Sequence, residues 1–272
     1  CFGFMRFATD NGAYIVPLFL SIWASKSLLI EKNVFKTGFL AAIACLFHQI
    51  HFFWWVGLFW IIWSYSKKSR IKNTFIFFIT ALTVPVIYTM VFYLSSNDSG
   101  SVIAFIFHDY VKSEHINVHP GAQSLMLTPV SFVRTFMQIH GYIVALLHKY
   151  LFLGFGILIA LAFFIAGCIS LFKKRISPLK RESTRFETIF ANGHLLIFFL
   201  QLLFAFISDG NAEFMVMLPF ALTLYLLLRF NLKKQVIAYF ASGMLAWNLA
   251  LGLIPARFME LDPNKSMCGY IS

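Results

Sequence analysis

Apolar runs that approach the length of a membrane crossing follow one another along this chain. A helix needs about 20 apolar residues to cross a bilayer, and five runs reach or approach that length: Phe75–Leu94, Tyr150–Phe172, Leu195–Ile207, Phe214–Leu228 and Val236–Ile254. Of the 272 residues, 60% are hydrophobic and 12% are charged, which is too apolar for a water-soluble domain of this size. The succession of runs also excludes a single removable signal sequence. The sequence therefore predicts an all-α, polytopic integral membrane protein.

The basic residues indicate which helix ends share one side of the membrane. Four connections, at residues 26–36, 67–72, 173–187 and 229–234, hold 16 of the 22 basic and three of the 11 acidic residues. Their net charge is +13, while the rest of the chain carries −2. This asymmetry follows the positive-inside rule and argues against a surface for nucleic acid. We therefore expect the four connections to face the cytoplasm.

The segment Thr37–Tyr65 lies between two of these basic connections. A single helix cannot begin and end on the same side, so the segment is predicted to enter the membrane and return. Each limb has about 14 residues, or roughly 20 Å at 1.5 Å per residue, which is shorter than a full crossing of about 30 Å. The stretch "LFHQIHFFWW" then places His48, Gln49 and His51 at the turn. Backbone at that depth is tolerated only where protein or a watery cavity covers it, so we predict a pair of short helices joined by a covered polar turn.

The remaining segments complete a single membrane domain over residues 1–272. We expect about seven membrane-embedded helical elements, which include this pair of short helices. An outer loop at 96–140 is predicted to contain the turn "NVHPGAQ" and to lead into an amphipathic interfacial helix, "PVSFVRTFMQIHGYIVALLHKY". Besides the pair, the predicted helices cover about residues 13–30, 72–94, 151–172, 186–207, 214–230 and 235–255, and residues 255–272 form an outer tail.

Four polar clusters fall on the outer side in this topology: "RFATDN", "HQIH", "FHDYVKSEHINVHPG" and "SDGNAE". Ionisable residues at the ends of membrane helices are candidates for function. Each cluster also has a structural interpretation, because Arg6 and Asp10 can form an i,i+4 pair and "SDGNAE" can be a tight turn. A metal is a further alternative for His48 with His51, and for the histidines and acids of the long loop, although a zinc or haem site needs more ligands than the first pair supplies.

Taken in chain order, the clusters resemble the GT-C type glycosyltransferases that use polyprenyl-phosphate sugars, such as the protein mannosyltransferases and the lipid A aminoarabinose transferase. In that group an Arg and an acidic residue open an inward helix, as in "MRFATDNGAYIVPLFLSIWAS". A polar turn then joins two short helices, where this chain has "ACLFHQIHFFWW". A late helix ends in Ser and a polar turn before a Pro and several Leu, as in "ISDGNAEFMVMLPFALTLYLLL". The similarity in organisation covers about residues 1–235.

The chain departs from the family pattern at its charged positions. The family's usual catalytic carboxylate lies in the first outer loop, and no residue here corresponds to it, so the resemblance implies that further N-terminal helices precede this sequence. His48 and Gln49 stand where the family turn has a Lys. Asp209, Asn211 and Glu213 stand where the late turn has a basic residue.

The family reaction assigns roles to the polar clusters. A polyprenyl-phosphate donor keeps its tail in lipid, so the site needs cations or helix amides for the phosphate and a carboxylate for the acceptor nucleophile. We expect Arg6, His48 and Arg134 on the phosphate side. Asp10 and Glu213 are the predicted catalytic carboxylates, acting on the acceptor hydroxyl or through a divalent cation, the one cofactor left open. The other predicted substrate-binding residues are Asn11, Gln49, His51, His108, Asp109, His140, Asp209 and Asn211.

The resemblance also implies a location and partners. We expect a bacterial inner membrane protein whose polar site faces the periplasm and whose partners are a polyprenyl-phosphate-linked sugar and other membrane subunits. The alternatives are a non-catalytic transferase-like subunit of a larger complex, a transporter or flippase, and a metal or haem redox subunit. A transporter of this kind is expected to show inverted internal symmetry, and none is evident in the sequence.

Overall fold

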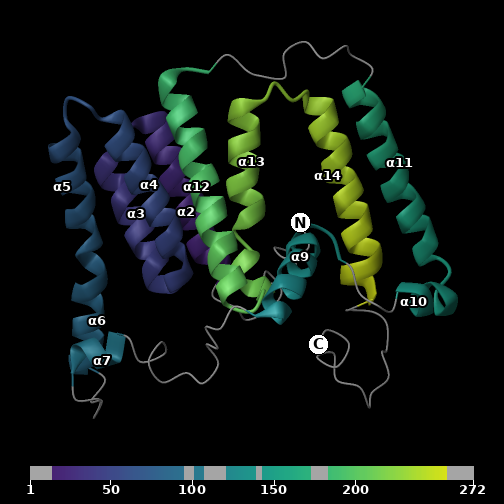
Figure 1. The fold of residues 1–272 in the computed structure, drawn as a ribbon, viewed down its shortest axis with the longest axis horizontal. Helices are drawn as coiled ribbons and strands as arrows, with labels where there is room; N and C mark the ends of the chain where they lie inside the picture. The colour runs from purple at the N-terminus through teal and green to yellow at the C-terminus, as the bar shows by residue number, and fades with distance from the viewer. Residues whose placement is uncertain (1–13, 95–100, 107–120, 139–142, 173–182, 256–272) are drawn as a thin grey trace.

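The computed structural model describes residues 14–94, 101–106, 121–138, 143–172 and 183–255, and this part of the chain is helical, without a β-strand (Figure 1). The predicted all-α fold is therefore confirmed for these residues. The α-helices are α2 (Ile15–Lys26), α3 (Val34–Phe47), α4 (Phe52–Tyr65), α5 (Arg70–Ala81), α6 (Thr83–Leu94), α7 (Val102–Ile106), α9 (Ala122–Phe136), α10 (Ile143–Lys149), α11 (Leu153–Phe172), α12 (Arg185–Ile207), α13 (Leu218–Arg229) and α14 (Lys234–Asn248).

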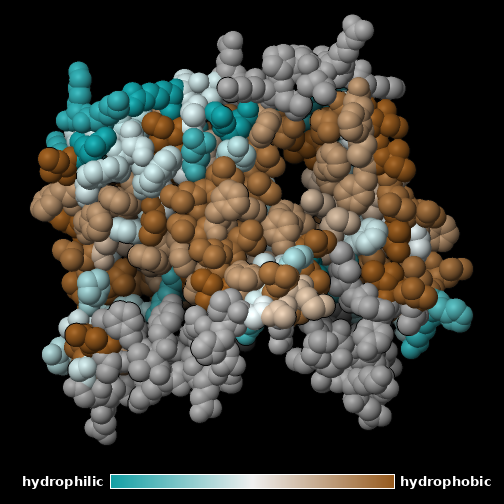
Figure 2. Space-filling model, in the orientation of Figure 1, coloured by the Kyte–Doolittle hydropathy of each residue, from teal (hydrophilic) through white to brown (hydrophobic). Residues whose placement is uncertain are grey.

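Five helical stretches in the described part of the chain are long and apolar enough to cross a membrane. They are Arg70–Leu94, Leu153–Phe172, Arg185–Ile207, Ala212–Arg229 and Lys234–Leu253. Figure 2 shows a band of hydrophobic side chains across the middle of the molecule, below a hydrophilic rim. The chain is a membrane protein with several membrane-spanning helices, as predicted, but the count of about seven membrane-embedded elements is not confirmed.

The long helices are arranged so that the described residues of the basic connections share one end of the molecule (Figure 1). This end, which we call the basic end, contains Lys32–Asn33, Ser66–Ser69, the start of α12 and Phe230–Lys233. The opposite end, which we call the His48 end, contains the turn after α3, the turn after α12 and the helix α9. The chain thus alternates direction as the charge pattern predicts.

The predicted pair of short helices is present. Helices α3 and α4 have 14 residues each, and a 3₁₀ turn at Gln49–His51 joins them. The chain leaves α3 at His48, whose backbone is extended (φ −157°, ψ 119°) and whose Nδ1 accepts a hydrogen bond from the Ile50 N–H at 3.3 Å. The segment Thr37–Tyr65 therefore folds back on itself, and its polar turn lies at the His48 end.

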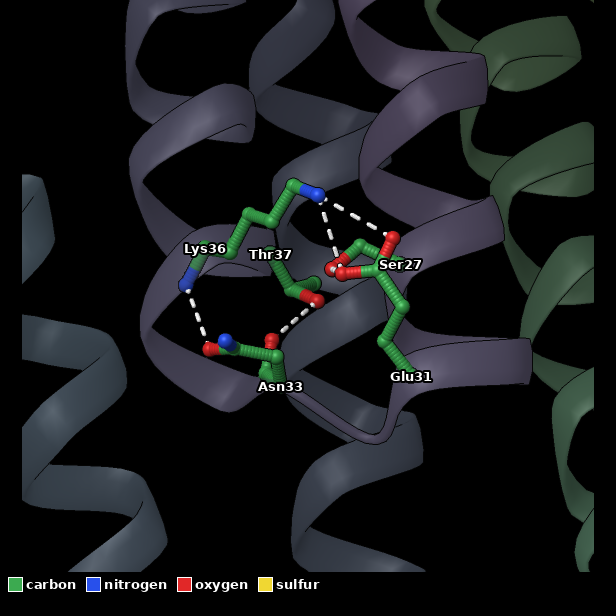
Figure 3. Close-up of polar contacts among 5 residues, drawn as sticks. All are labelled: Ser27, Glu31, Asn33, Lys36 and Thr37. Atoms are coloured by element: carbon green, nitrogen blue, oxygen red, sulfur yellow. Dashed lines mark hydrogen bonds and ion pairs between the residues drawn. The ribbon is translucent and has the colours of Figure 1, made fainter.

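A compact corner at the basic end connects α2 to α3 (Figure 3). The chain leaves α2 through a π-helical turn, Ser27–Glu31, and reverses at Lys32, which has a left-handed backbone (φ 55°). Asn33 caps α3, because its Oδ1 accepts from the Lys36 N–H at 2.9 Å. Lys36 Nζ also pairs with the Glu31 carboxylate at 2.9 Å. The reversal at Lys32 and the Asn33 cap set α2 and α3 antiparallel, and the solvent-exposed Glu31–Lys36 pair adds little to the stability of the corner.

The amphipathic segment differs from its prediction. One helix over residues 129–150 was expected, but α9 begins at Ala122 and ends at Phe136, and α10 begins at Ile143. Helix α9 ends at Phe136 because the buried Asn248 side chain bonds to the backbone groups at its C-terminus. Asn248 Nδ2 donates to the Phe136 carbonyl at 2.9 Å, and Asn248 Oδ1 accepts from the Gln138 N–H at 2.8 Å. The end of α9 is therefore set by a residue 112 positions away in the sequence, which local sequence patterns do not reveal.

Glycines allow the helices of the core to approach closely. Gly57 of α4 faces α12, and Gly193 of α12 faces α4, so that a Cβ added at either one would overlap an isoleucine of the other helix, Ile197 or Ile61 respectively. Small residues at such crossings are the usual means by which membrane helices pack, since van der Waals contact replaces the hydrophobic effect. The short helix α4 is thereby held against a long one, with Trp54 fully buried between them.

Candidate functional site

A carboxylate, a phenol and an imidazole meet at the His48 end. The Tyr14 hydroxyl, just before α2, donates to Glu213 Oε2 at 3.0 Å. The Tyr14 ring also packs on the His48 ring, with the centroids 4.6 Å apart. Three segments separated in the sequence, at the start of α2, the short-helix turn and the turn after α12, therefore form one cluster.

The turn Ser208–Asn211 positions Glu213. Asp209 and Gly210 both have positive φ angles, 53° and 69°, so the chain reverses sharply after α12. Asn211 Oδ1 then accepts from the Glu213 N–H at 3.0 Å and starts the 3₁₀ segment Ala212–Met215. The prediction that "SDGNAE" is a turn is confirmed, and Glu213, one of its two acidic residues, lies near Tyr14 and His48.

The same turn holds α9 against the helix bundle. Asp209 Oδ1 accepts from the Ser124 hydroxyl at 2.7 Å. Gly210 lies so close to α9 that an added Cβ would come within 2.6 Å of the backbone nitrogen of Thr128. In the described structure, the Asp209 carboxylate therefore bonds to Ser124 and helps to hold α9 in place. Its predicted contact with substrate remains a prediction.

His51 and Gln49 bond to residues other than Glu213. The His51 side chain is buried, and its Nδ1 lies 2.7 Å from Ser21 Oγ on α2. The Gln49 Nε2 donates to the Tyr88 hydroxyl on α6 at 3.5 Å. Of the three polar residues in the turn, His48 is the one that the structure places beside the carboxylate.

A second buried group of polar side chains continues from α2 into α12. Trp54 Nε1 donates to Ser25 Oγ at 2.9 Å, and Ser25 Oγ lies 2.9 Å from His194 Nε2. His194 Nδ1 lies 2.9 Å from the Phe190 carbonyl, so the proton must be on Nδ1 and Nε2 must accept from Ser25. The buried polar groups of this chain of bonds therefore satisfy one another.

Burial controls the charge state of the cluster at the His48 end. Burial, reinforced by the neighbouring Glu213 carboxylate, raises the pKa of Tyr14, so the hydroxyl stays protonated and remains a donor. Burial also lowers the pKa of His48, and the Glu213 charge opposes that effect. Because Nδ1 of His48 accepts from Ile50, the neutral ring carries its proton on Nε2, which can donate to a ligand.

The lowered pKa of His48 predicts acid sensitivity. The unfolded chain binds a proton on this histidine near its ordinary pKa of about 6.5, while the folded chain still resists protonation, so a fall in pH favours unfolding. Between about pH 7.5 and pH 5.5, the melting temperature of the wild type in detergent should fall more than that of His48→Gln. The control is His148→Gln, which removes an exposed histidine outside the cluster. Its melting temperature should change with pH as steeply as that of the wild type. Equal slopes for His48→Gln and the wild type would contradict this assignment.

Other predicted site residues lie outside the described residues: Arg6, Asp10, Asn11, His108, Asp109 and His140. Arg134 lies in the last turn of α9 and is half-buried. As for the metal alternative, the described ranges contain no group of three or more His, Cys, Asp or Glu residues that could hold an ion.

Sequence reasoning missed several residues that the structure brings to these sites. Tyr14 was treated as part of a membrane helix, although it lies only three residues after the end of the "RFATDN" cluster. Ser21 and Ser25 are four residues apart in an apolar stretch, a spacing that puts both on one helix face and could have signalled partners there. Ser124 gave no signal, because a serine in a loop has many ordinary roles.

Comparison of the chain with models of protein families, with curated proteins and with solved structures finds no match.

Proposed function

We propose that this chain is a GT-C-like membrane glycosyltransferase that moves a sugar from a polyprenyl-phosphate donor to an acceptor at the His48 end. In this proposal, that end faces the periplasm and the basic end faces the cytoplasm of a bacterial inner membrane. The observation that carries the proposal is the Glu213 carboxylate, held by Tyr14 beside His48 at the turn of two short helices.

The chemistry of the cluster suits group transfer from a lipid phosphate. Tyr14 donates to one carboxylate oxygen of Glu213, and the other oxygen, Oε1, can accept the proton of an acceptor hydroxyl as it attacks the sugar. His48 Nε2–H can donate to a phosphate oxygen of the leaving group. The predicted contributions of Arg6 and Asp10 would add a cation and a second carboxylate on the same side.

The membrane-facing surface supports a lipid substrate. Figure 2 shows a hollow between α13 and α14 within the hydrophobic band. Helix α14 packs mainly along α11, and α9 lies below the hollow at the His48 end. A polyprenyl tail could occupy such an opening while its phosphate reaches the polar end.

Glu213→Gln is expected to reduce sugar transfer at least about 100-fold, the usual contribution of a general base. The assay uses the full chain in vesicles with a radiolabelled sugar on a polyprenyl phosphate, tested over several sugars. Glu31→Gln is the matched control, because Glu31 is also exposed but lies at the basic end, and it should retain transfer. Full activity of Glu213→Gln would remove this carboxylate from the mechanism, and absence of transfer by the wild type with every donor would reject the glycosyltransferase.

A transporter or flippase is the second candidate, and one observation favours it. The bonds of Ser21 with His51 and of Ser25 with His194 place two buried histidines along α2, inside the bundle. Buried histidines in membrane proteins often belong to proton or substrate pathways. Solute or lipid movement across vesicles that is lost in Ser25→Ala, without any sugar transfer by the wild type, would favour this candidate.

A further inference from the structure

A cavity of about 420 Å³ opens at the basic end, far from Glu213. It lies between the Lys32 corner, the connection Ser66–Ser69 and the start of α12. The residues that line it are Leu28, Lys32, Val34, Ile62, Tyr65, Ser66, Lys67, Lys68, Ser69, Asn73 and Phe186. Its lining includes three lysines and, among the described residues, no acidic side chain.

The polar half of the cavity is composed of donors. Asn73 Nδ2 donates to Ser66 Oγ at 2.9 Å and to Ser69 Oγ at 3.1 Å, so each serine keeps its own hydroxyl proton for donation to an anion. Ser69 is also the N-cap of α5, a helix of 12 residues, and it makes no side-chain capping bond. The positive end of this helix therefore adds to the field of the lysines.

Lys32 is constrained at the edge of the cavity. Its backbone is left-handed and reverses the chain between α2 and α3. Its Nζ lies 2.9 Å from the ring centroid of Phe186. Burial lowers the pKa of Lys32, although the charge of Glu187 opposes that effect. Lys32 is exposed to solvent as a whole, so its ammonium group is accessible to an anion in the cavity, whose charge would favour the protonated form.

The other half of the cavity is apolar, with Leu28, Val34, Ile62 and Phe186 in its wall. A ligand with an anionic group beside a hydrocarbon part would match both halves. The volume is too small for a macromolecule, and cations near the membrane surface attract anionic lipids at about 1 kcal/mol for each basic residue.

We propose that this cavity binds a phosphate group, with Lys32, Lys67 and Lys68 as its cations and the hydroxyls of Ser66 and Ser69 as donors. The phosphate belongs either to the headgroup of an anionic phospholipid or to a small soluble phosphate. The site is separate from the proposed glycosyltransferase centre and does not depend on that activity.

The test measures binding of two probes to the purified full chain in detergent. Native mass spectrometry follows phosphatidylglycerol, with phosphatidylcholine as the neutral comparison, and calorimetry follows inorganic pyrophosphate. The double variant Lys67→Gln, Lys68→Gln should weaken binding of the recognised probe about 30-fold, at about 1 kcal/mol for each lysine. The matched control is Lys233→Gln, Lys234→Gln, which removes the same charge from exposed positions at the same end, outside the cavity, and it should bind as the wild type does.

Each outcome decides the proposal. Selective binding of phosphatidylglycerol that depends on Lys67 and Lys68 supports a lipid headgroup site, and binding of pyrophosphate with the same dependence supports a soluble phosphate. Equal losses in the two double variants would show a general surface charge effect and overturn the site. Failure of the wild type to bind either probe would also overturn it.

Discussion

Gly193→Leu should prevent the folded bundle from forming or destabilise it severely. Any Cβ at Gly193 overlaps Cγ1 of Ile61, and the backbone carbonyl of Gly57 lies 3.4 Å from the same position, so a whole leucine side chain has no space between α4 and α12. Overpacking of a core typically costs about 1–3 kcal/mol and can cost more when backbones must separate. The expected result is a large loss of monodisperse protein in detergent, measured by size-exclusion chromatography and thermal unfolding.

Gly154→Leu is the matched control. Gly154 lies in α11, and a Cβ at this position meets no atom within 4 Å, so the same substitution should be tolerated. A second variant isolates the contact itself: Gly193→Ala should destabilise the protein, and adding Ile61→Ala should recover part of the loss by removing the overlapping atoms. If Gly193→Leu is as stable as Gly154→Leu, the close contact of α4 with α12 is wrong.

The reversal at His48 could be predicted from charge alone. Basic connections on both sides of Thr37–Tyr65 left no other way to place 29 mostly apolar residues, and a turn in their middle follows from geometry. The prediction did not require knowledge of any contact. By contrast, the packing of Gly57 on Gly193 depends on two residues 136 positions apart, and neither glycine is distinguishable in the sequence from one with open space beside it, such as Gly154.

The candidate site was predictable to the level of its segments but not of its side chains. The topology brings the turn after α3 and the turn after α12 to the same end, and it therefore places His48 and Glu213 in one region. The 3₁₀ geometry of Gln49–His51 decides which side chain of the turn faces the carboxylate. A shift of one residue in this turn would place a different side chain beside Glu213. For that reason, His51 was predicted at the site but lies against Ser21 instead.

Asn248→Leu is expected to detach the end of α14 from α9. The Asn248 side chain is fully buried and joins the two helices by its bonds to the Phe136 carbonyl and the Gln138 N–H. Leucine has a similar size but leaves both backbone groups without these partners, at about 1–3 kcal/mol for each. The melting temperature should therefore fall, and hydrogen exchange should increase at residues 134–138, as followed by mass spectrometry.

The control is the same substitution at Asn231, an exposed residue whose side chain does not join two helices. Asn231→Leu, in the connection between α13 and α14, should change stability by less than about 0.5 kcal/mol, as is usual for surface positions. The comparison also bears on the hollow between α13 and α14, because the bonds of Asn248 help to hold α14 above α9. If exchange near Gln138 stays at the wild-type level in Asn248→Leu, the two helices are held by other contacts, and the hollow does not depend on this asparagine.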